Sequence, residues 1–316
     1  MKYDHLIKRP FEIVARRPYL WFLGFLAGTA TAFNVPNGGT NYGRRGTSDA
    51  YEGPSWAALQ NIWNQNGELI VGILAVFVVL CIVMFVLGCI ATGGIIHAAV
   101  EHDDDHEYTL GKAWRAGYET GWRIAGLRLL AFLLTVLPAV LIGTLVVAAV
   151  AGAMDSAGAA AVGFGLVAAA VLPVSIAFWF LLGVAFQLAK RIIVLEDGHV
   201  AESLSSGFRM IFSHFKEVGL GWLILVAVSI GVGIAIAVLT FVVAIPGVAI
   251  GFGGWAVGGA TGAIVAGSFA AIFIVGILLV ASAAYSAYSS VYWTLLFRSV
   301  RGLPAPAARG AIIPAA

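Results

Sequence analysis

Charged side chains are scarce in this sequence, and their scarcity excludes a large class of proteins. Asp, Glu, Lys and Arg make up only 11% of the 316 residues, whereas 60% of the residues are hydrophobic. A soluble globule of this size needs more polar surface than these residues can supply. The composition therefore excludes a soluble globular protein and predicts a chain embedded in a lipid bilayer.

Cysteine content and net charge are also low. The two cysteines, Cys81 and Cys89, lie in one apolar run, where their spacing on a helix separates them by about 12 Å and puts them beyond disulfide reach. The formal net charge is +2, and no basic stripe is interleaved with aromatic residues outside the membrane-flanking segments. We therefore predict that nucleic acid is not a partner.

Motifs for catalysis are missing as well. The sequence contains no GxSxG, no GxxxxGK and no HExxH pattern, which are signatures of serine hydrolases, P-loop nucleotide sites and zinc proteases. Ionisable side chains are also absent from the middle of its apolar stretches, where a charge costs about 2.5 to 3.5 kcal/mol and is kept mainly for ion pathways or catalysis. We predict a protein that is not an enzyme and uses no cofactor.

Long apolar stretches are what the sequence has in abundance. Six are long enough to cross a bilayer. They cover residues 19–35, 69–100, 124–154, 157–189, 218–245 and 263–296. The predicted fold class is all-α, a polytopic bundle of six transmembrane helices. Of the 18 Lys and Arg residues, 16 lie on one side of these spans, and loops rich in them stay in the cytoplasm. Both termini are therefore predicted to be cytoplasmic.

Three amphipathic segments precede the odd-numbered spans and suggest a repeat. They read RPFEIVARRPYLWFLGF from Arg9, AGYETGWRIAGLRLLAF from Ala116 and SGFRMIFSHFKEVGLGW from Ser206. Such helices lie at the membrane interface, so we predict three helical hairpins with cytoplasmic amphipathic helices, although any multi-pass protein needs amphipathic connectors. The single transmembrane domain, residues 1–316, divides into 1–100 with an outer loop at 34–67, then 101–195, 196–300, and a flexible cytoplasmic tail at 301–316.

Small residues recur at the four-residue spacing that lets membrane helices approach closely. Gly24 and Gly28 have this spacing in the first span, and Gly254, Gly258 and Gly262 have it around the start of the last. We predict helix packing at all five glycines. A re-entrant pore element at the second group is the alternative.

Seven ionisable residues stand together at 101–107, in the sequence EHDDDHE. If the second span continues as a helix, His102 and His106 lie one turn apart on one face with Asp103 and Asp105 nearby, which is a plausible arrangement for a divalent metal. The alternative is a solvated acidic turn before the next helix, where acidic residues are favoured electrostatically.

The last span ends in a polar and aromatic segment, SAAYSAYSSVYWTLLFRSVRG from Ser282. Tyr285, Tyr288 and Tyr292 lie along one side of a helix and Ser286 lies on another, which predicts a lining for a lipid or small ligand. Interhelical hydrogen bonds and an aromatic belt at the membrane interface are the alternative.

Three segments carry a resemblance to a known family. They are RRPYLWFLGFLAG in the first span, AKRIIVLEDGHVAESLSSGFRM after the fourth and AAYSAYSSVYWTLLFRSVRG closing the sixth. The order of features resembles the six-span membrane domain associated with glycerophosphoryl diester phosphodiesterases and related uncharacterised prokaryotic membrane proteins. In the fused proteins hydrolysis belongs to a separate soluble domain, and nothing like that domain is expected here. The resemblance implies a non-catalytic module in a prokaryotic plasma (inner) membrane.

The predicted function is that of a scaffold, anchor or accessory subunit of a membrane assembly. Its predicted partners are membrane lipids and other membrane subunits or a second copy of the chain. One alternative is a transporter or lipid-handling protein that uses a cavity between the hairpins. Another is a membrane enzyme with a metal at the cytoplasmic acidic segment.

Overall fold

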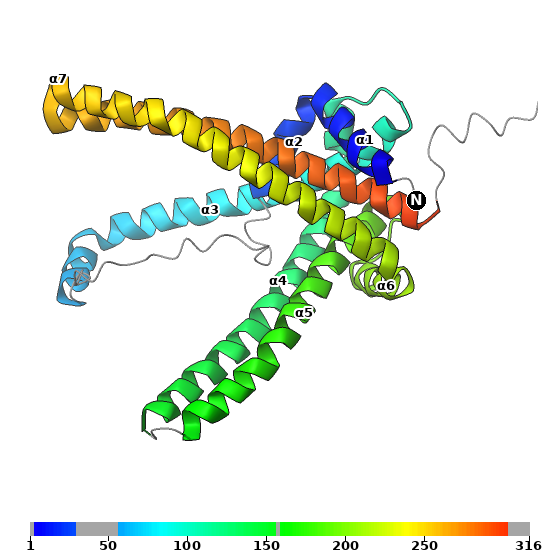
Figure 1. The fold of residues 1–316 in the computed structure, drawn as a ribbon, viewed down its shortest axis with the longest axis horizontal. Coiled ribbons are helices and arrows are strands. Elements are labelled where there is room, and N and C mark those ends of the chain that lie inside the picture. The colour runs from blue at the N-terminus through cyan, green and yellow to red at the C-terminus, as the bar shows by residue number, and fades with distance from the viewer. Residues whose placement is uncertain (1–2, 30–55, 156–158, 303–316) are drawn as a thin grey trace, which may run out of the picture.

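The computed structural model describes residues 3–29, 56–155 and 159–302. Seven helices make up this part of the chain: α1 (Tyr3–Arg16), α2 (Tyr19–Thr29), α3 (Trp56–Asp103), α4 (Leu110–Asp155), α5 (Ala159–Leu195), α6 (Val200–Ser213) and α7 (Phe215–Val300). Figure 1 shows long helices that diverge from a common end. The predicted all-α class is confirmed for the described residues.

The longest helix, α7, is a hairpin of two limbs. The chain reverses at Gly258 and Gly259, whose backbone angles are not helical, and Gly259 has a φ of 59°. This left-handed conformation costs glycine little because it has no Cβ. We call residues 215–257 the first limb and residues 260–300 the second limb. The two limbs lie side by side in Figure 1.

Two of the predicted packing glycines bring the limbs together near the turn. A Cβ on Gly254 would lie 2.5 Å from the carbonyl oxygen of Gly262, and a Cβ on Gly262 would lie 2.2 Å from the carbonyl oxygen of Gly254. Gly258 does not fit the packing prediction. Apart from its neighbours along the chain, neither limb approaches within 4 Å of the position that a Cβ on Gly258 would take, because Gly258 belongs to the turn itself.

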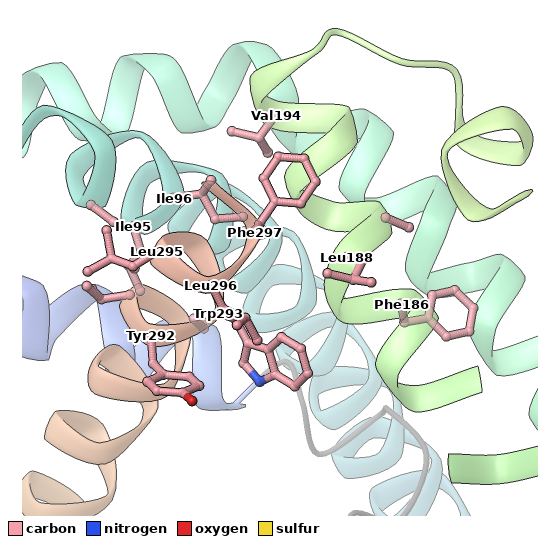
Figure 2. Packing of buried hydrophobic residues seen from close by; sticks show 14 of the residues in the cluster. Ile95, Ile96, Phe186, Leu188, Val194, Tyr292, Trp293, Leu295, Leu296 and Phe297 are labelled. Carbon is pink, nitrogen blue, oxygen red and sulfur yellow. The ribbon is translucent and has the colours of Figure 1, made fainter. Parts of the chain in front are cut away.

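Three arms diverge from a shared end, which we call the base (Figure 1). The arms are the N-terminal part of α3, the far ends of α4 and α5, and the α7 hairpin. The base holds the hydrophobic core, where Ile95, Leu127, Leu188 and Leu296 are fully buried. Figure 2 shows side chains from α3, α5 and the second limb of α7 meeting in this core. Helix ends therefore form the core, and the arms add little to it.

The arms are apolar and exposed. Val76 of α3 is 69% exposed, and Phe241 and Phe269 of α7 are 74% and 72% exposed. The exposed apolar residues of α3 run from Leu69 to Val86, which corresponds to about 27 Å of helix and approaches the ~30 Å hydrocarbon core of a bilayer. Surfaces of this size and character are stable against lipid or another protein, but not against water.

Within the described residues, five helices are long and apolar enough to cross a membrane. They cover Trp63–Asp103, Leu110–Thr144, Pro173–Leu195, Phe215–Gly262 and Ile264–Val300. The chain thus has the helices of a membrane protein. The other predicted span, residues 19–35, coincides in part with the shorter apolar helix α2, and residues 30–35 lie outside the described part. Six spans therefore stay a prediction.

The three amphipathic segments do not all form separate helices. Helices α1 and α6 are separate and have 14 residues each. Helix α1 ends at Arg16, close to Pro18, and the position before a proline disfavours helix. The second segment has no such break and continues into the apolar part of α4. The threefold repeat of a separate interfacial helix is therefore not seen at this segment.

The predicted outer loop at 34–67 contains helix at its far end. Residues 30–55 lie outside the described part of the chain, but α3 begins at Trp56 and is interrupted at Asn66, where φ is −129°. The predicted tail at 301–316 lies outside the described residues from position 303 onward.

Candidate functional site

Two cavities in the base share Tyr285, which belongs to the second limb of α7. The first, which we call the apolar cavity, has a volume of about 540 Å³ and lies between α1, α2 and both limbs of α7. Val14, Trp21, Val228 and Ala284 are among the hydrophobic residues that line it. This cavity can accept hydrocarbon but offers few polar contacts.

The second, which we call the polar cavity, has a volume of about 390 Å³ and is lined by α2, α3, α4, α5 and the second limb of α7. Its hydroxyl groups come from Thr92, Ser282, Tyr285, Ser286, Ser289 and Ser290. Three cationic side chains also line it, those of Arg128, Lys190 and Arg191. Residues that are far apart in the sequence thus meet around one polar space.

The three cations of the polar cavity are buried. Arg128 is 3% exposed, Lys190 is 6% exposed and Arg191 is 1% exposed. Within the part of the chain that the structure describes, none of them forms an ion pair with a carboxylate. Burial of a charge without a counter-charge is costly in a protein interior. The burial of these three cations therefore requires an explanation.

Neutral oxygens accept hydrogen bonds from only some of the N–H donors of these cations. Arg128 donates from Nη2 to Thr92 Oγ1 at 2.8 Å. Arg191 donates from Nη1 to Gln187 Oε1 at 2.8 Å and from Nη2 to the Ser290 carbonyl oxygen at 3.1 Å. Nε and Nη1 of Arg128 and Nε of Arg191 are buried and have no hydrogen-bond partner in the described part of the chain. These donors are available to an oxygen ligand.

The four residues predicted from the last span to line a ligand site lie in different places. Tyr285 lines both cavities, Ser286 lines the polar cavity and Tyr288 lines the apolar cavity. Tyr292 is fully buried and donates a hydrogen bond to the Gly221 carbonyl oxygen at 2.7 Å. Tyr292 therefore joins the two limbs of α7 and lines neither cavity.

Gly24 lets α2 close one wall of the polar cavity. A Cβ at this position would lie 2.3 Å from the Ala283 carbonyl oxygen of α7. The packing at Gly28 is looser, because the nearest atom, Ser286 Oγ, would lie 3.4 Å away. Both glycines line the polar cavity, so the spacing predicted for helix packing also shapes the candidate site.

The acidic segment at 101–107 is helical only in its first three residues. Helix α3 ends at Asp103, and Asp105 has a positive φ of 57°. His106 therefore lies outside the helix, and the arrangement on which a metal site with His102 depends is not formed. Across the described residues there is no group of three His, Cys, Asp or Glu side chains suited to a metal ion.

Arginines from two other helices pair with the three aspartates of this segment. Arg298 of α7 contacts Asp103 Oδ2 and Asp104 Oδ1, each at 2.9 Å. Arg9 of α1 pairs with Asp105 and lies 3.8 Å from Asp103 Oδ1. The acidic segment thus ties α1 and the end of α7 to the end of α3.

The two histidines of the segment also have partners within the protein. His102 Nε2 shares a hydrogen bond with the Tyr19 hydroxyl, and His106 Nδ1 contacts Glu101 Oε2 at 3.1 Å. The ring of Tyr108 packs edge-on against His102. Burial raises the pKa of the Tyr108 hydroxyl. These contacts are those of a structural junction.

Comparison with known proteins identifies a family but no activity. Residues 19–300 match a family of unknown function (DUF7544). The chain belongs to this family. No curated protein and no solved structure matches the chain. The family match does not connect this member to glycerophosphoryl diester phosphodiesterases, so that resemblance stays a prediction.

The three cations of the polar cavity were not predicted as binding residues. In the sequence, Lys and Arg positions indicated only the orientation of the spans. One local signal marks them. Lys190 and Arg191 stand in the segment LAKRIIVL, with apolar residues on both sides. A membrane-flanking charge normally begins a polar loop, whereas these two lie within α5, which continues to Leu195. Arg128 has a similar setting in GLRLLAF.

Proposed function

We propose that this protein is a multi-pass membrane protein that holds a membrane lipid in the cavities around Tyr285 and does not transform it. The observation that carries this proposal is the apolar cavity of about 540 Å³, which adjoins helices whose exposed surfaces are hydrophobic. Ligand sites of proteins typically have ~300 to 1,000 Å³ and a mainly apolar lining with a few polar groups. Tyr285 lines both cavities, and its hydroxyl shares a hydrogen bond with Ser229 Oγ.

A non-catalytic role is supported by the chemistry of the lining residues. Among the described residues that line the two cavities there is no carboxylate and no histidine. These side chains are the general acids and bases that enzymes use most often. We therefore propose lipid handling, or an accessory or anchoring role in a membrane assembly that depends on a bound lipid.

The topology that we propose has six spans, with the base and both termini on the cytoplasmic side of a prokaryotic plasma membrane. The distribution of Lys and Arg supports this orientation, and the apolar sequence at 19–35, which begins with α2, supports the first span. The exposed arms support a place among other membrane subunits or copies of the chain, because their apolar surfaces are free for lipid or protein.

Filling the apolar cavity tests the proposed function. Ala284 lines this cavity, so Ala284→Trp would fill part of it. We expect the lipid retained by the purified protein to fall about tenfold, since each ~1.4 kcal/mol of lost binding free energy is a factor of ten. Native mass spectrometry from a mild detergent measures the retained lipid.

Ala271→Trp is the matched control, because Ala271 lies on the same limb of α7 but is exposed on the arm. It should retain as much lipid as the wild type. Equal retention by Ala284→Trp, Ala271→Trp and the wild type would show that the apolar cavity does not hold the lipid.

A further inference from the structure

We propose that the polar cavity binds a phosphate group, held by Arg128, Lys190 and Arg191. This inference deepens the proposed function, because it names the chemical class of the ligand, and its expected source is the head group of an anionic membrane lipid. A free phosphate ion offers the same chemistry and is the other source to be tested.

The first argument is the charge that the cavity leaves without compensation. The three cations are at least nine-tenths buried, and within the described residues no carboxylate pairs with them. Cationic side chains gathered in one buried place repel each other and lose much of their hydration. An anion in the cavity removes both penalties, so the site is built for a ligand of negative charge.

The second argument is the set of free donors. Arg128 Nε and Nη1 and Arg191 Nε have no hydrogen-bond partner among the residues that the structure describes. Each of these N–H groups can donate a charge-assisted hydrogen bond to a phosphate oxygen, because a guanidinium group keeps its positive charge. Hydroxyl groups of Ser282 and Ser286 line the same cavity and add weaker donors for the remaining phosphate oxygens.

The third argument is the depth of the site. On α4, exposed aliphatic residues recur along the arm from Leu129, which directly follows Arg128 and is 67% exposed. On the second limb of α7 the exposed apolar stretch ends at Val280, just before Ser282. Trp122, at 85% exposure, is an aromatic residue of the kind that lies at the level of lipid head groups. The cations therefore lie where the exposed hydrocarbon-facing surface ends, which is the level of a lipid phosphate.

The fourth argument is the position of Tyr285 between the two kinds of lining. It contributes to the polar cavity with its three cations and to the apolar cavity beside Trp21. A lipid with a phosphate and a hydrocarbon chain likewise has one polar part and one apolar part. The pair of cavities thus suits a phospholipid better than it suits a purely polar or purely apolar ligand.

Lipid selectivity tests this inference. The full chain is reconstituted in nanodiscs with equal amounts of phosphatidylglycerol and phosphatidylcholine, and native mass spectrometry measures which lipid the extracted protein retains. We expect the wild type to prefer phosphatidylglycerol. Arg128→Gln and Lys190→Met should each lower this preference by about tenfold or more, as expected for loss of a charged hydrogen bond.

Surface variants and a conservative variant provide the controls. Arg115→Gln and Lys112→Met remove exposed cations of the same helix, α4, and should leave the preference unchanged. Arg128→Lys keeps the charge without the two-nitrogen donor and should retain an intermediate preference. This variant also separates loss of the site from failure to fold.

Inorganic phosphate, added to lipid-free protein in a neutral detergent, identifies the source of the anion. A rise in the thermal midpoint that Arg128→Gln abolishes supports a site for free phosphate. Selectivity for phosphatidylglycerol without any effect of phosphate supports a lipid head group.

The inference and the proposed function can fail separately. If both cation variants retain lipid with the same preference as the wild type, and phosphate has no effect, the phosphate site is wrong but lipid binding stands. If the wild type retains no lipid but phosphate stabilises it through Arg128, the lipid function is wrong and the phosphate site stands.

Discussion

Two groups of buried arginines in the base differ in the partners that surround them. Arg298 is 5% exposed and contacts two carboxylates at 2.9 Å. Arg191 is 1% exposed and contacts only neutral oxygens of Gln187 and Ser290. Among the described residues, the fold thus brings carboxylates to one group and none to the other. A buried charge with partners can hold a structure together, whereas a buried charge without them is costly and is a candidate for binding.

Breaking the paired group should give the largest effect on stability. Asp103→Asn removes the buried carboxylate shared by Arg298 and Arg9 and leaves Arg298 with Asp104 alone. We expect the free energy of unfolding to fall by about 3 kcal/mol, because an incompletely compensated charge is left buried. Denaturant unfolding in detergent micelles measures the change.

Asp104→Asn is the control for this prediction. Asp104 is 15% exposed at its side chain, against 6% for Asp103, so its loss should cost less. A cost equal to that of Asp103→Asn would show that burial does not decide the strength of these pairs.

Removing a cation from the unpaired group should have a smaller effect of opposite sign. Arg128→Leu replaces a buried, uncompensated charge by an apolar side chain. In lipid-free, neutral detergent we expect the free energy of unfolding to rise by about 1 kcal/mol. Thr92 keeps a partner in the variant, because its hydroxyl donates to the Gly88 carbonyl oxygen at 2.7 Å. The same unfolding measurement checks the sign, and a loss of stability would place Arg128 among the structural arginines.

The exposed arginines give the smallest expected effect. Arg115 lies 3.7 Å from Glu119, but the two side chains are 86% and 69% exposed. Arg115→Ala should change the free energy of unfolding by less than about 0.5 kcal/mol, because exposed ion pairs are screened by water and salt. A double-mutant cycle with Glu119→Ala measures the pair, and a coupling as large as that at Asp103 would remove the distinction between buried and exposed pairs.

The helices were predictable because their apolar stretches are long and continuous. The spans predicted at 69–100, 218–245 and 263–296 fall on α3 and on the two limbs of α7. Gly258 was misassigned because the four-residue spacing of small residues is the same in a packed helix and in a turn flanked by packed helices. Only the backbone angles at Gly258 and Gly259 distinguish the two.

The candidate site was predictable only in part. Tyr285 and Ser286 were found because the last span is unusually rich in tyrosine and serine, but Tyr292 belongs to the same pattern and packs against Gly221 instead. His102 and Asp103 looked like metal ligands because the spacing assumed a continuing helix. Their actual partners, Tyr19 and Arg298, come from distant segments, which local spacing does not reveal.

The sequence by itself determined that this chain belongs in a membrane and that its apolar segments are helical, because hydrophobic composition and run length act locally and need no knowledge of neighbours. Tertiary structure alone decided which cations have carboxylate partners. That outcome depends on distances between α3, α4, α5 and α7, and the energy of a charge depends on everything packed around it. Arg298 and Arg191 are the same residue type in adjoining parts of the base, and only their surroundings make one structural and the other a candidate for binding.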